Sequence, residues 1–331
     1  MSVSIAVEEA SGVGEARRRS GAVAREAALS EHDAATLALV VTELATNLVK
    51  HARNGGEILL RPIPAGGAVE VLAIDRGPGI DVIADAFRDS YSTAGGPGLG
   101  LGAVGRLATQ FDLHTAQGSG TVLLARVGGA PPDSVVVGAV CLPIAGETES
   151  GDAWAVVEAA SIRRVILADG VGHGPEAAAA ADEAIRVVKA SPGAPLDSLF
   201  ALLHARLAAT RGAAIAIADL DPSGERLRYA GVGNIVGAVV DPSAAGGATQ
   251  KNLVSHAGTV GHEMRRVQAF DAPWPRGSTL VMHSDGARAR WALDRYPGLA
   301  RRHPSVVAGV LYRDFARGTD DVTVAAVRAA G

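Results

Sequence analysis

The sequence is organised around Leu167–Gly174, which reads LADGVGHG. The apolar run Val165–Ala168 ends at Asp169, and glycines then occupy every second position before an alanine-rich segment begins. This pattern predicts a buried strand that ends in a carboxylate and turns into a helix. Backbone without side chains lets charged oxygens approach a hard cation, but a tight turn in which Asp169 is a local cap uses the same residues. The stretch alone leaves both interpretations open.

Length and composition restrict the class of protein. A chain of 331 residues suggests two domains, and its net charge of −4 argues against a nucleic-acid partner. The single cysteine, Cys141, excludes an intrachain disulfide framework and a multi-thiolate zinc site. No apolar run approaches the ~18 residues that span a bilayer, and the N-terminus lacks a signal-peptide pattern. We therefore expect a cytoplasmic protein that binds neither nucleic acid nor membrane.

The N-terminal half contains a predicted helix that starts near Ser30 or Asp33, a pair that resembles a capping box. Apolar residues at helical spacing form one stripe, and Glu43 and Asn47 share a face away from it. A carboxylate and an amide one turn apart can serve as a base and a Mg²⁺ ligand. They can equally form an exposed polar pair.

Two glycine patterns follow this helix. A predicted strand over residues 68–74 ends in Asp75-Arg-Gly77-Pro-Gly79, and Gly98-Leu-Gly100-Leu-Gly102 opens a predicted helix over residues 103–110. Glycines at a helix N-terminus offer bare N–H groups to a phosphate. The same spacing also occurs in plain helix–strand packing, so each pattern is weak by itself.

In combination and in this order, the motifs Glu43-x-x-x-Asn47, Asp75-x-Gly77-x-Gly79 and Gly98-x-Gly100-x-Gly102 resemble the N, G1 and G2 boxes of the GHKL ATP-binding fold. The amino-acid sequence over residues 1–128 is most similar to the anti-sigma-factor serine kinases of the RsbW/RsbT type. The resemblance implies a Bergerat α/β sandwich that binds ATP and Mg²⁺.

By this resemblance, Asn47 is a ligand of the Mg²⁺ that bridges the ATP phosphates, and Glu43 is the base for a substrate serine. Asp75 hydrogen-bonds the adenine amino group, and Gly79 leaves room for the base. Residues 81–97 form a lid. The other residues that the resemblance assigns to nucleotide binding are Gly77, Gly98, Gly100, Gly102 and Thr121.

Residues 129–133 read as a linker, and residues 134–331 as a β-rich domain with inserted helices. Patterns in this half include a predicted strand over residues 266–270 and a helical stretch after Asp285. Carboxylates border several of its apolar strands. Oxygen-only clusters suit Mg²⁺ or Mn²⁺ better than zinc, and two such ions ~3.5–4 Å apart can bind a phosphate and activate water.

The pattern SGD…ADGVGHG…HSDG…GTDDVT resembles the SpoIIE/RsbX branch of the metal-dependent protein phosphatases. It implies an αββα sandwich with two Mn²⁺ or Mg²⁺ ions. The implied metal ligands are Asp152, Asp169, the Gly170 carbonyl, Asp285 and Asp320. The choice between Asp320 and its neighbour Asp321 stays open at this point. His173 fits either a general acid for the leaving serine oxygen or a turn residue.

The expected fold class is therefore α+β, a GHKL sandwich followed by a phosphatase αββα sandwich. The expected function is a bifunctional regulator of a partner-switching or stressosome pathway, which phosphorylates and dephosphorylates serine on STAS-domain anti-anti-sigma or stressosome proteins. A sigma factor is a further candidate partner. In the alternative, only the phosphatase works, and the N-terminal domain is a nucleotide-dependent protein-binding module.

Overall fold

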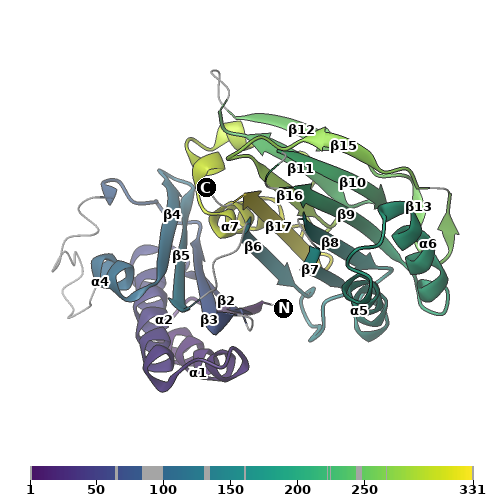
Figure 1. Cartoon of the computed structure of the whole chain (residues 1–331). Coiled ribbons are helices and arrows are strands. Elements are labelled where there is room, and N and C mark those ends of the chain that lie inside the picture. Colours follow the sequence, from purple (N-terminus) through teal and green to yellow (C-terminus); the bar gives the residue numbers. More distant parts are fainter. Residues whose placement is uncertain are drawn as a thin grey trace. The chain divides into compact units, whose positions relative to one another are not determined.

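The computed structural model describes residues 2–63, 66–83, 100–129, 135–159, 162–221, 223, 225–243, 248–265 and 267–329. Gly98 and most of the predicted lid and linker lie outside these residues. The chain divides into two compact units, Met1–Pro132 and Asp133–Gly331 (Figure 1). Each unit has its own sheets and its own core.

The first unit is a two-layer α/β sandwich. Its antiparallel sheet has the strand order β1-β2-β3-β5-β4, and the helices among the described residues of this unit pack on one face of it (Figure 1). The strands are β1 (Val3–Val7), β2 (Gly56–Ile63), β3 (Ala68–Asp75), β4 (Gln110–Ala116) and β5 (Gly120–Gly128). The helices are α1 (Ala10–Glu26), α2 (Glu31–His51) and α4 (Gly100–Leu107).

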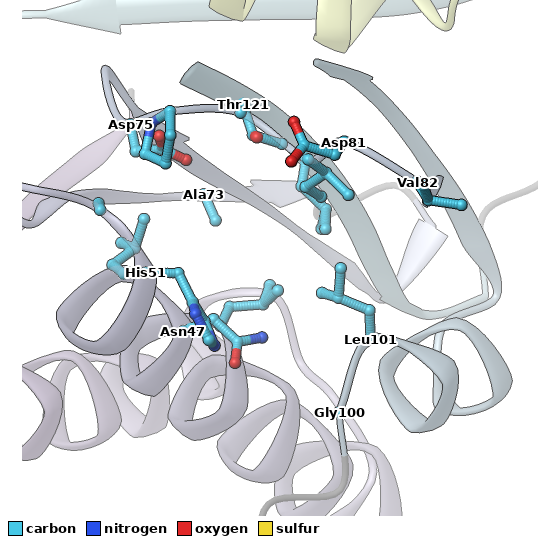
Figure 2. A pocket seen from close by; sticks show the side chains of 16 residues that line it. Asn47, His51, Ala73, Asp75, Asp81, Val82, Gly100, Leu101 and Thr121 are labelled. Atoms are coloured by element: carbon cyan, nitrogen blue, oxygen red, sulfur yellow. The ribbon is translucent and has the colours of Figure 1, made fainter. Parts of the chain in front are cut away.

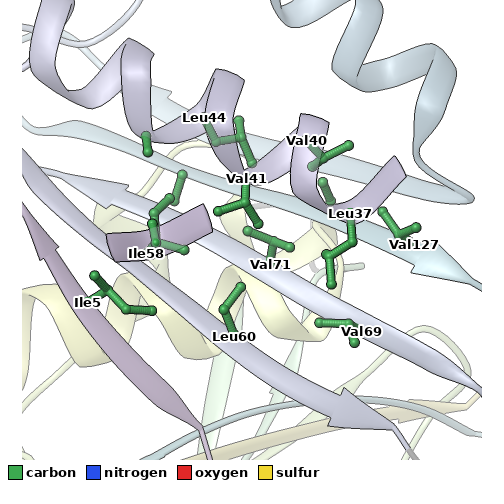
Figure 3. Packing of buried hydrophobic residues seen from close by; sticks show 14 of the residues in the cluster. Ile5, Leu37, Val40, Val41, Leu44, Ile58, Leu60, Val69, Val71 and Val127 are labelled. Carbon is green, nitrogen blue, oxygen red and sulfur yellow. The ribbon is translucent and has the colours of Figure 1, made fainter. Parts of the chain in front are cut away.

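Helix α2 is the element that joins this core to the site. The Ser30 hydroxyl accepts the Asp33 N–H at 3.1 Å, which confirms the predicted cap and satisfies a donor at the helix start. The apolar stripe of α2 packs on alternate residues of the sheet (Figure 3). The stripe consists of Leu37, Val40, Val41 and Leu44, and the sheet residues below it include Ile58, Leu60, Val69 and Val71.

The second unit contains two five-stranded antiparallel sheets, with the orders β15-β10-β9-β8-β7 and β12-β11-β16-β17-β6. The strands of the first sheet are β7 (Asp152–Ala159), β8 (Ile162–Gly170), β9 (Ala213–Asp221), β10 (Arg226–Val232) and β15 (Phe270–Pro273). Those of the second are β6 (Val135–Leu142), β11 (Val236–Asp241), β12 (Thr249–Leu253), β16 (Thr279–His283) and β17 (Val322–Ala329). A short hairpin pairs β13 (Gly258–Thr259) with β14 (Glu263–Met264).

Helices cover the outer faces of both sheets. Helices α5 (Pro175–Ala190) and α6 (Leu196–Leu207) belong to the first sheet, and α7 (Pro304–Phe315) packs on β6 and β17. One buried cluster, with members such as Leu167, Tyr229 and Met282, joins the inner faces of the two sheets. The unit is thus an αββα sandwich, and the expected fold class is confirmed. No helix in the described part of the chain is long and apolar enough to cross a membrane.

Three local predictions were wrong. The helix expected over residues 103–110 is α4 (Gly100–Leu107), because its apolar face starts at Leu101 and Gln110 already pairs in β4. The strand expected over residues 266–270 is β15, which begins at Phe270 and is placed by pairing with β10. The helical stretch expected after Asp285 consists of two short 3-10 turns, Leu293–Arg295 and Leu299–Arg301, because Pro297-Gly298 interrupts it.

Candidate functional site

The first unit contains a cavity of about 500 Å³ between α2, β3, β5 and the start of α4. This volume is in the range of pockets that hold small ligands. Predicted nucleotide-binding residues from separate parts of the chain line it together: Asn47, Asp75, Gly79, Gly100 and Thr121 (Figure 2). The structure thus brings together the residues of three separate motifs.

The turn after β3 holds one end of this cavity. The Asp75 carboxylate accepts the Gly77 N–H at 2.7 Å, so Gly77 orients Asp75 without lining the cavity itself. Gly79 has φ of +81°, and a Cβ there would lie 2.4 Å from the Ala116 carbonyl oxygen. Only glycine satisfies both the positive φ and the close approach to β4.

A threonine that the sequence argument missed supports this turn. The Thr115 hydroxyl accepts the Ile80 N–H at 2.8 Å and lies 3.0 Å from the hydroxyl of Thr121. Thr115 and Thr121 are register partners in β4 and β5, so their hydroxyls meet on one face of the sheet. A Thr–Thr pair across a hairpin was the signal available in the sequence.

The other end of the cavity faces α2 and α4. Asn47 and His51 lie one turn apart on α2 and project toward the cavity, opposite Gly100 and Leu101 at the start of α4 (Figure 2). Free N–H groups at such a helix start suit an anion. Gly102 is buried in the first turn of α4 and, like Glu43 one turn before Asn47, is not among the lining residues.

The second unit gathers carboxylates where strands of both sheets end. Asp152 begins β7 and is the direct register partner of Asp169, near the end of β8. Asp285 follows β16, and Asp320 precedes β17, the neighbour of β16. Strand pairing therefore places the predicted ligands at one edge of the sandwich.

These carboxylates lie close enough together for their charges to repel one another. Burial, together with the charges of Asp152, Asp285, Asp320 and Asp321, raises the pKa of Asp169 to about 9. Burial and the nearby acids also raise the pKa of Asp152 to about 7. Burial and Asp320 raise the pKa of Asp285 as well, against the opposing charge of Arg317.

Two polar partners of the acids were not expected from the sequence. The buried Ser284 hydroxyl donates to Asp152 at 2.6 Å, and the Asn234 amide donates to Asp285 at 2.7 Å. Ser284 also accepts the Thr323 N–H at 3.0 Å, which joins β16 to β17 beside the acids. Both residues orient carboxylates by hydrogen bonds, and such a role is hard to predict from a single sequence.

Asp320 and Asp321 differ in their surroundings. Asp321 is 3 % exposed, and its two carboxylate oxygens accept the N–H groups of Ile144 at 2.8 Å and Gly151 at 2.9 Å. The Asp320 carboxylate accepts the Asp321 N–H at 2.9 Å through one oxygen. Asp321 is thus engaged by the backbone, and Asp320 keeps the freer carboxylate.

The LADGVGHG turn lies directly beside these acids. The Gly170 N–H donates to the Gly151 carbonyl at 2.9 Å, and a Cβ at Gly170 would lie 2.2 Å from the carbonyl oxygen of Ala177 in α5. His173 is 61 % exposed, and its Nδ1 lies 2.9 Å from the Glu147 carboxylate. Gly170 is therefore required for packing, and His173 is an exposed side chain paired with Glu147.

The donor chemistry of the cluster fits divalent cations. Among the residues that the structure describes, no three or more His, Cys, Asp or Glu side chains are arranged so that together they could hold a metal ion. The acids nevertheless offer only oxygen donors, they are held by N–H and hydroxyl groups, and they repel one another. A hard cation such as Mg²⁺ or Mn²⁺ suits such a donor set and relieves the repulsion.

Comparison with known proteins agrees with this geometry in both units. Residues 6–127 match the histidine kinase-like ATPase domain, and residues 163–330 match the Stage II sporulation protein E (SpoIIE) family. Over 112 residues the chain is 35% identical to the serine/threonine-protein kinase RsbT of Bacillus subtilis (strain 168), a match that covers 33% of this chain and 84% of RsbT.

Two solved structures are also similar. A chain from a structure of the bacterial stressosome, described as a modular system adapted to control secondary messenger signalling, is 28% identical with a TM-score of 0.53, and the match covers 59% of this chain and 100% of that one. RsbX in complex with magnesium shares the fold at 17% identity and a TM-score of 0.51, over 60% of this chain and 98% of that one. The chain therefore belongs to the SpoIIE family through its second unit, and its first unit is a histidine kinase-like ATPase domain of the RsbT family.

Proposed function

We propose that this protein both adds phosphate to, and removes phosphate from, serine residues of STAS-domain partners in a partner-switching pathway. The observation that carries the proposal is the pairing, in one chain, of a nucleotide-sized cavity lined by Asn47, Asp75 and Thr121 with a cluster of mutually repelling, at least partly buried carboxylates. The first suits ATP, and the second suits divalent metals. The two sites have opposite chemistry toward a phosphoserine.

In the first unit, Asp75 receives the adenine amino group, and Gly79 leaves room for the ring. Asn47 holds the Mg²⁺ that neutralises the phosphates, while N–H groups at the start of α4 bind phosphate oxygens. Glu43, one turn from Asn47 on α2, takes the proton of the incoming serine. Phosphoryl transfer depends mainly on positioning and electrostatics, which such a site provides.

In the second unit, the carboxylates of Asp152, Asp169, Asp285 and Asp320 and the carbonyl of Gly170 hold two Mg²⁺ or Mn²⁺ ions. Such a metal pair supplies an activated water and neutralises the phosphate. Ser284 and Asn234 keep two of the carboxylates oriented by hydrogen bonds.

The relatives support a choice of partner, since RsbT is a serine/threonine-protein kinase and the stressosome is the assembly of the similar solved structure. We propose STAS-domain anti-anti-sigma or stressosome proteins as substrates, with a sigma factor as a further candidate partner. We also propose a cytoplasmic location, because the proposed phosphoryl donor, ATP, is available there.

The phosphatase activity is tested on a phosphoserine STAS protein with Mn²⁺ present. We expect Asp152→Asn and Asp285→Asn to lose at least 100-fold in kcat/KM, because each removes a carboxylate from the metal cluster. Asp182→Asn, which changes an exposed carboxylate on α5, serves as the matched control and retains the activity. Unchanged turnover in both cluster variants would contradict the metal assignment.

A second candidate, in which the first unit only binds nucleotide and partner, is favoured by the position of Glu43 outside the cavity lining. Glu43→Gln separates the two. A kinase predicts that this variant keeps ATP affinity and loses transfer to serine, whereas Glu26→Gln at the exposed end of α1 changes neither. If the wild type transfers no phosphate and Glu43→Gln still captures the partner with ATP bound, the binding module is the correct description.

A further inference from the structure

We propose that Asp321 is a positioning residue, an acceptor-only clamp that holds the segments carrying the metal ligands in register. This inference rests on the proposed phosphatase site. It assigns Asp321 a part that differs from that of the adjacent Asp320.

The clamp joins both ends of one loop to the start of β17. Residues 143–151 connect β6 to β7, and the N–H groups near the two ends of this loop, of Ile144 and Gly151, donate to different oxygens of the Asp321 carboxylate at 2.8 and 2.9 Å. Gly151 directly precedes Asp152. One buried side chain therefore sets where β7, and with it Asp152, begins.

Asp321 also contacts the neighbours of two other acids. A Cβ at Gly286, directly after Asp285, would lie 1.9 Å from the Asp321 carbonyl oxygen. The Asp321 N–H donates to the Asp320 carboxylate at 2.9 Å. Asp321 is thus packed or hydrogen-bonded next to Asp152, Asp285 and Asp320 at once, although these three come from separate parts of the chain.

The hydrogen bonds require a carboxylate at this position. Both partners are backbone N–H donors, and an ionised aspartate accepts through both oxygens. An asparagine turns one end into an NH₂ donor that opposes the N–H of Ile144 or Gly151, and it leaves that buried N–H without an acceptor. Space is restricted as well, because a Cβ at Gly151 would lie 2.7 Å from Asp321 Oδ2.

The test is a Mn²⁺ binding isotherm, measured by calorimetry on the full chain for the wild type, Asp321→Asn, Asp320→Asn and Asp182→Asn. We expect Asp321→Asn to keep the wild-type stoichiometry with a Kd raised roughly 10- to 100-fold, as for other residues that support metal ligands. Its phosphatase kcat should recover at saturating Mn²⁺. Asp320→Asn should instead lose bound metal, and Asp182→Asn should bind like the wild type.

Two results overturn the clamp. Wild-type affinity in Asp321→Asn shows that the hydrogen bonds do not position the ligands, and a reduced stoichiometry shows that Asp321 is itself a ligand. If Asp321→Asn fails to fold, Gly151→Ala decides, because its methyl group would lie 2.7 Å from Asp321 Oδ2, nearer than its other close neighbour, the Ala177 Cβ at 2.9 Å, and it does not change the charge. A raised Kd in Gly151→Ala supports the proposal, and an unchanged Kd overturns it.

The controls separate this inference from the proposed function. If Asp152→Asn and Asp285→Asn bind Mn²⁺ like the wild type, the metal site itself is wrong. If these two lose Mn²⁺ while Asp321→Asn binds it normally, the clamp alone fails.

Discussion

Replacing Asp169 with asparagine should make the metal-free protein more stable, even though it removes a predicted ligand. Burial and four neighbouring acids raise the pKa of Asp169 from its ordinary value of 3.8 to about 9. The native state therefore retains a proton that the unfolded chain releases at neutral pH. Because the pKa of Asp169 is raised in the folded state, the contribution of this side chain to the free energy of unfolding is complete below about pH 4. It is lost as the pH rises toward 9.

The size of this loss follows from the same numbers. Between pH 3.8 and 7, at about 1.4 kcal/mol per pH unit, the loss reaches about 4 kcal/mol. Asparagine cannot ionise. The free energy of unfolding of Asp169→Asn should therefore exceed that of the wild type by about 2–4 kcal/mol at pH 7 and by less than about 2 kcal/mol at pH 5. Asp152, with a pKa of about 7, adds to the pH dependence of the free energy of unfolding in both the wild type and Asp169→Asn.

The assay is urea unfolding in EDTA at several pH values, followed by tryptophan fluorescence. The three tryptophans, Trp154, Trp274 and Trp291, all belong to the second unit, so the signal reports on that unit alone. Excess Mn²⁺ should then stabilise the wild type and not Asp169→Asn, which reverses their order. A variant that is no more stable than the wild type at pH 7, or a difference that does not grow with pH, would refute the electrostatic reasoning.

Other contacts lead to further predictions. Gly79→Ala should lower ATP affinity at least 10-fold by calorimetry, because its Cβ would lie 2.4 Å from the Ala116 oxygen, whereas Gly118→Ala has a similar positive φ in open space and should bind ATP normally. Thr115→Val removes the acceptor of the Ile80 N–H and should weaken ATP binding with little change in the free energy of unfolding beyond about 1–2 kcal/mol; equal ATP affinity would show that the threonine pair does not support the cavity. Ser284→Ala removes the acceptor of the Thr323 N–H and one donor to the Asp152 carboxylate, so thermal unfolding should show a loss of about 2–3 kcal/mol and calorimetry a weaker Mn²⁺ affinity; wild-type values in both would remove Ser284 from the site.

The order of the motifs predicted much of the fold and of the candidate site, because glycine and aspartate at strand ends have few physical roles. Asp152, Asp169, Asp285 and Asp320 follow or precede apolar runs, and runs of this kind paired as neighbouring strands. The turn from Asp75 to Gly79 could be predicted for a similar reason. The positive φ at position 79 requires a glycine, and a glycine is visible in the sequence. Such features are local.

The contacts that refine the site are not local. Ser284 reaches Asp152 across 132 residues, and Ile144 reaches Asp321 across 177. No periodicity or composition in the sequence indicates either pair, because each pair joins segments that are distant in the chain and meet only in the folded domain. For that reason the choice between Asp320 and Asp321 could not be made from the sequence, and Thr115 was overlooked.

The central claim is that one chain carries opposing activities toward phosphoserine, and the phosphatase-blocked variant tests it most directly. The measurement is the transfer of label from γ-labelled ATP to a STAS-domain partner with Mg²⁺, compared between the wild type, Asp169→Asn and Asp169→Asn/Glu43→Gln. The account predicts that labelled phosphoserine accumulates with Asp169→Asn, turns over with the wild type when Mn²⁺ is added, and is absent from the double variant. No label on the partner with Asp169→Asn, or equal label with the double variant, would contradict it.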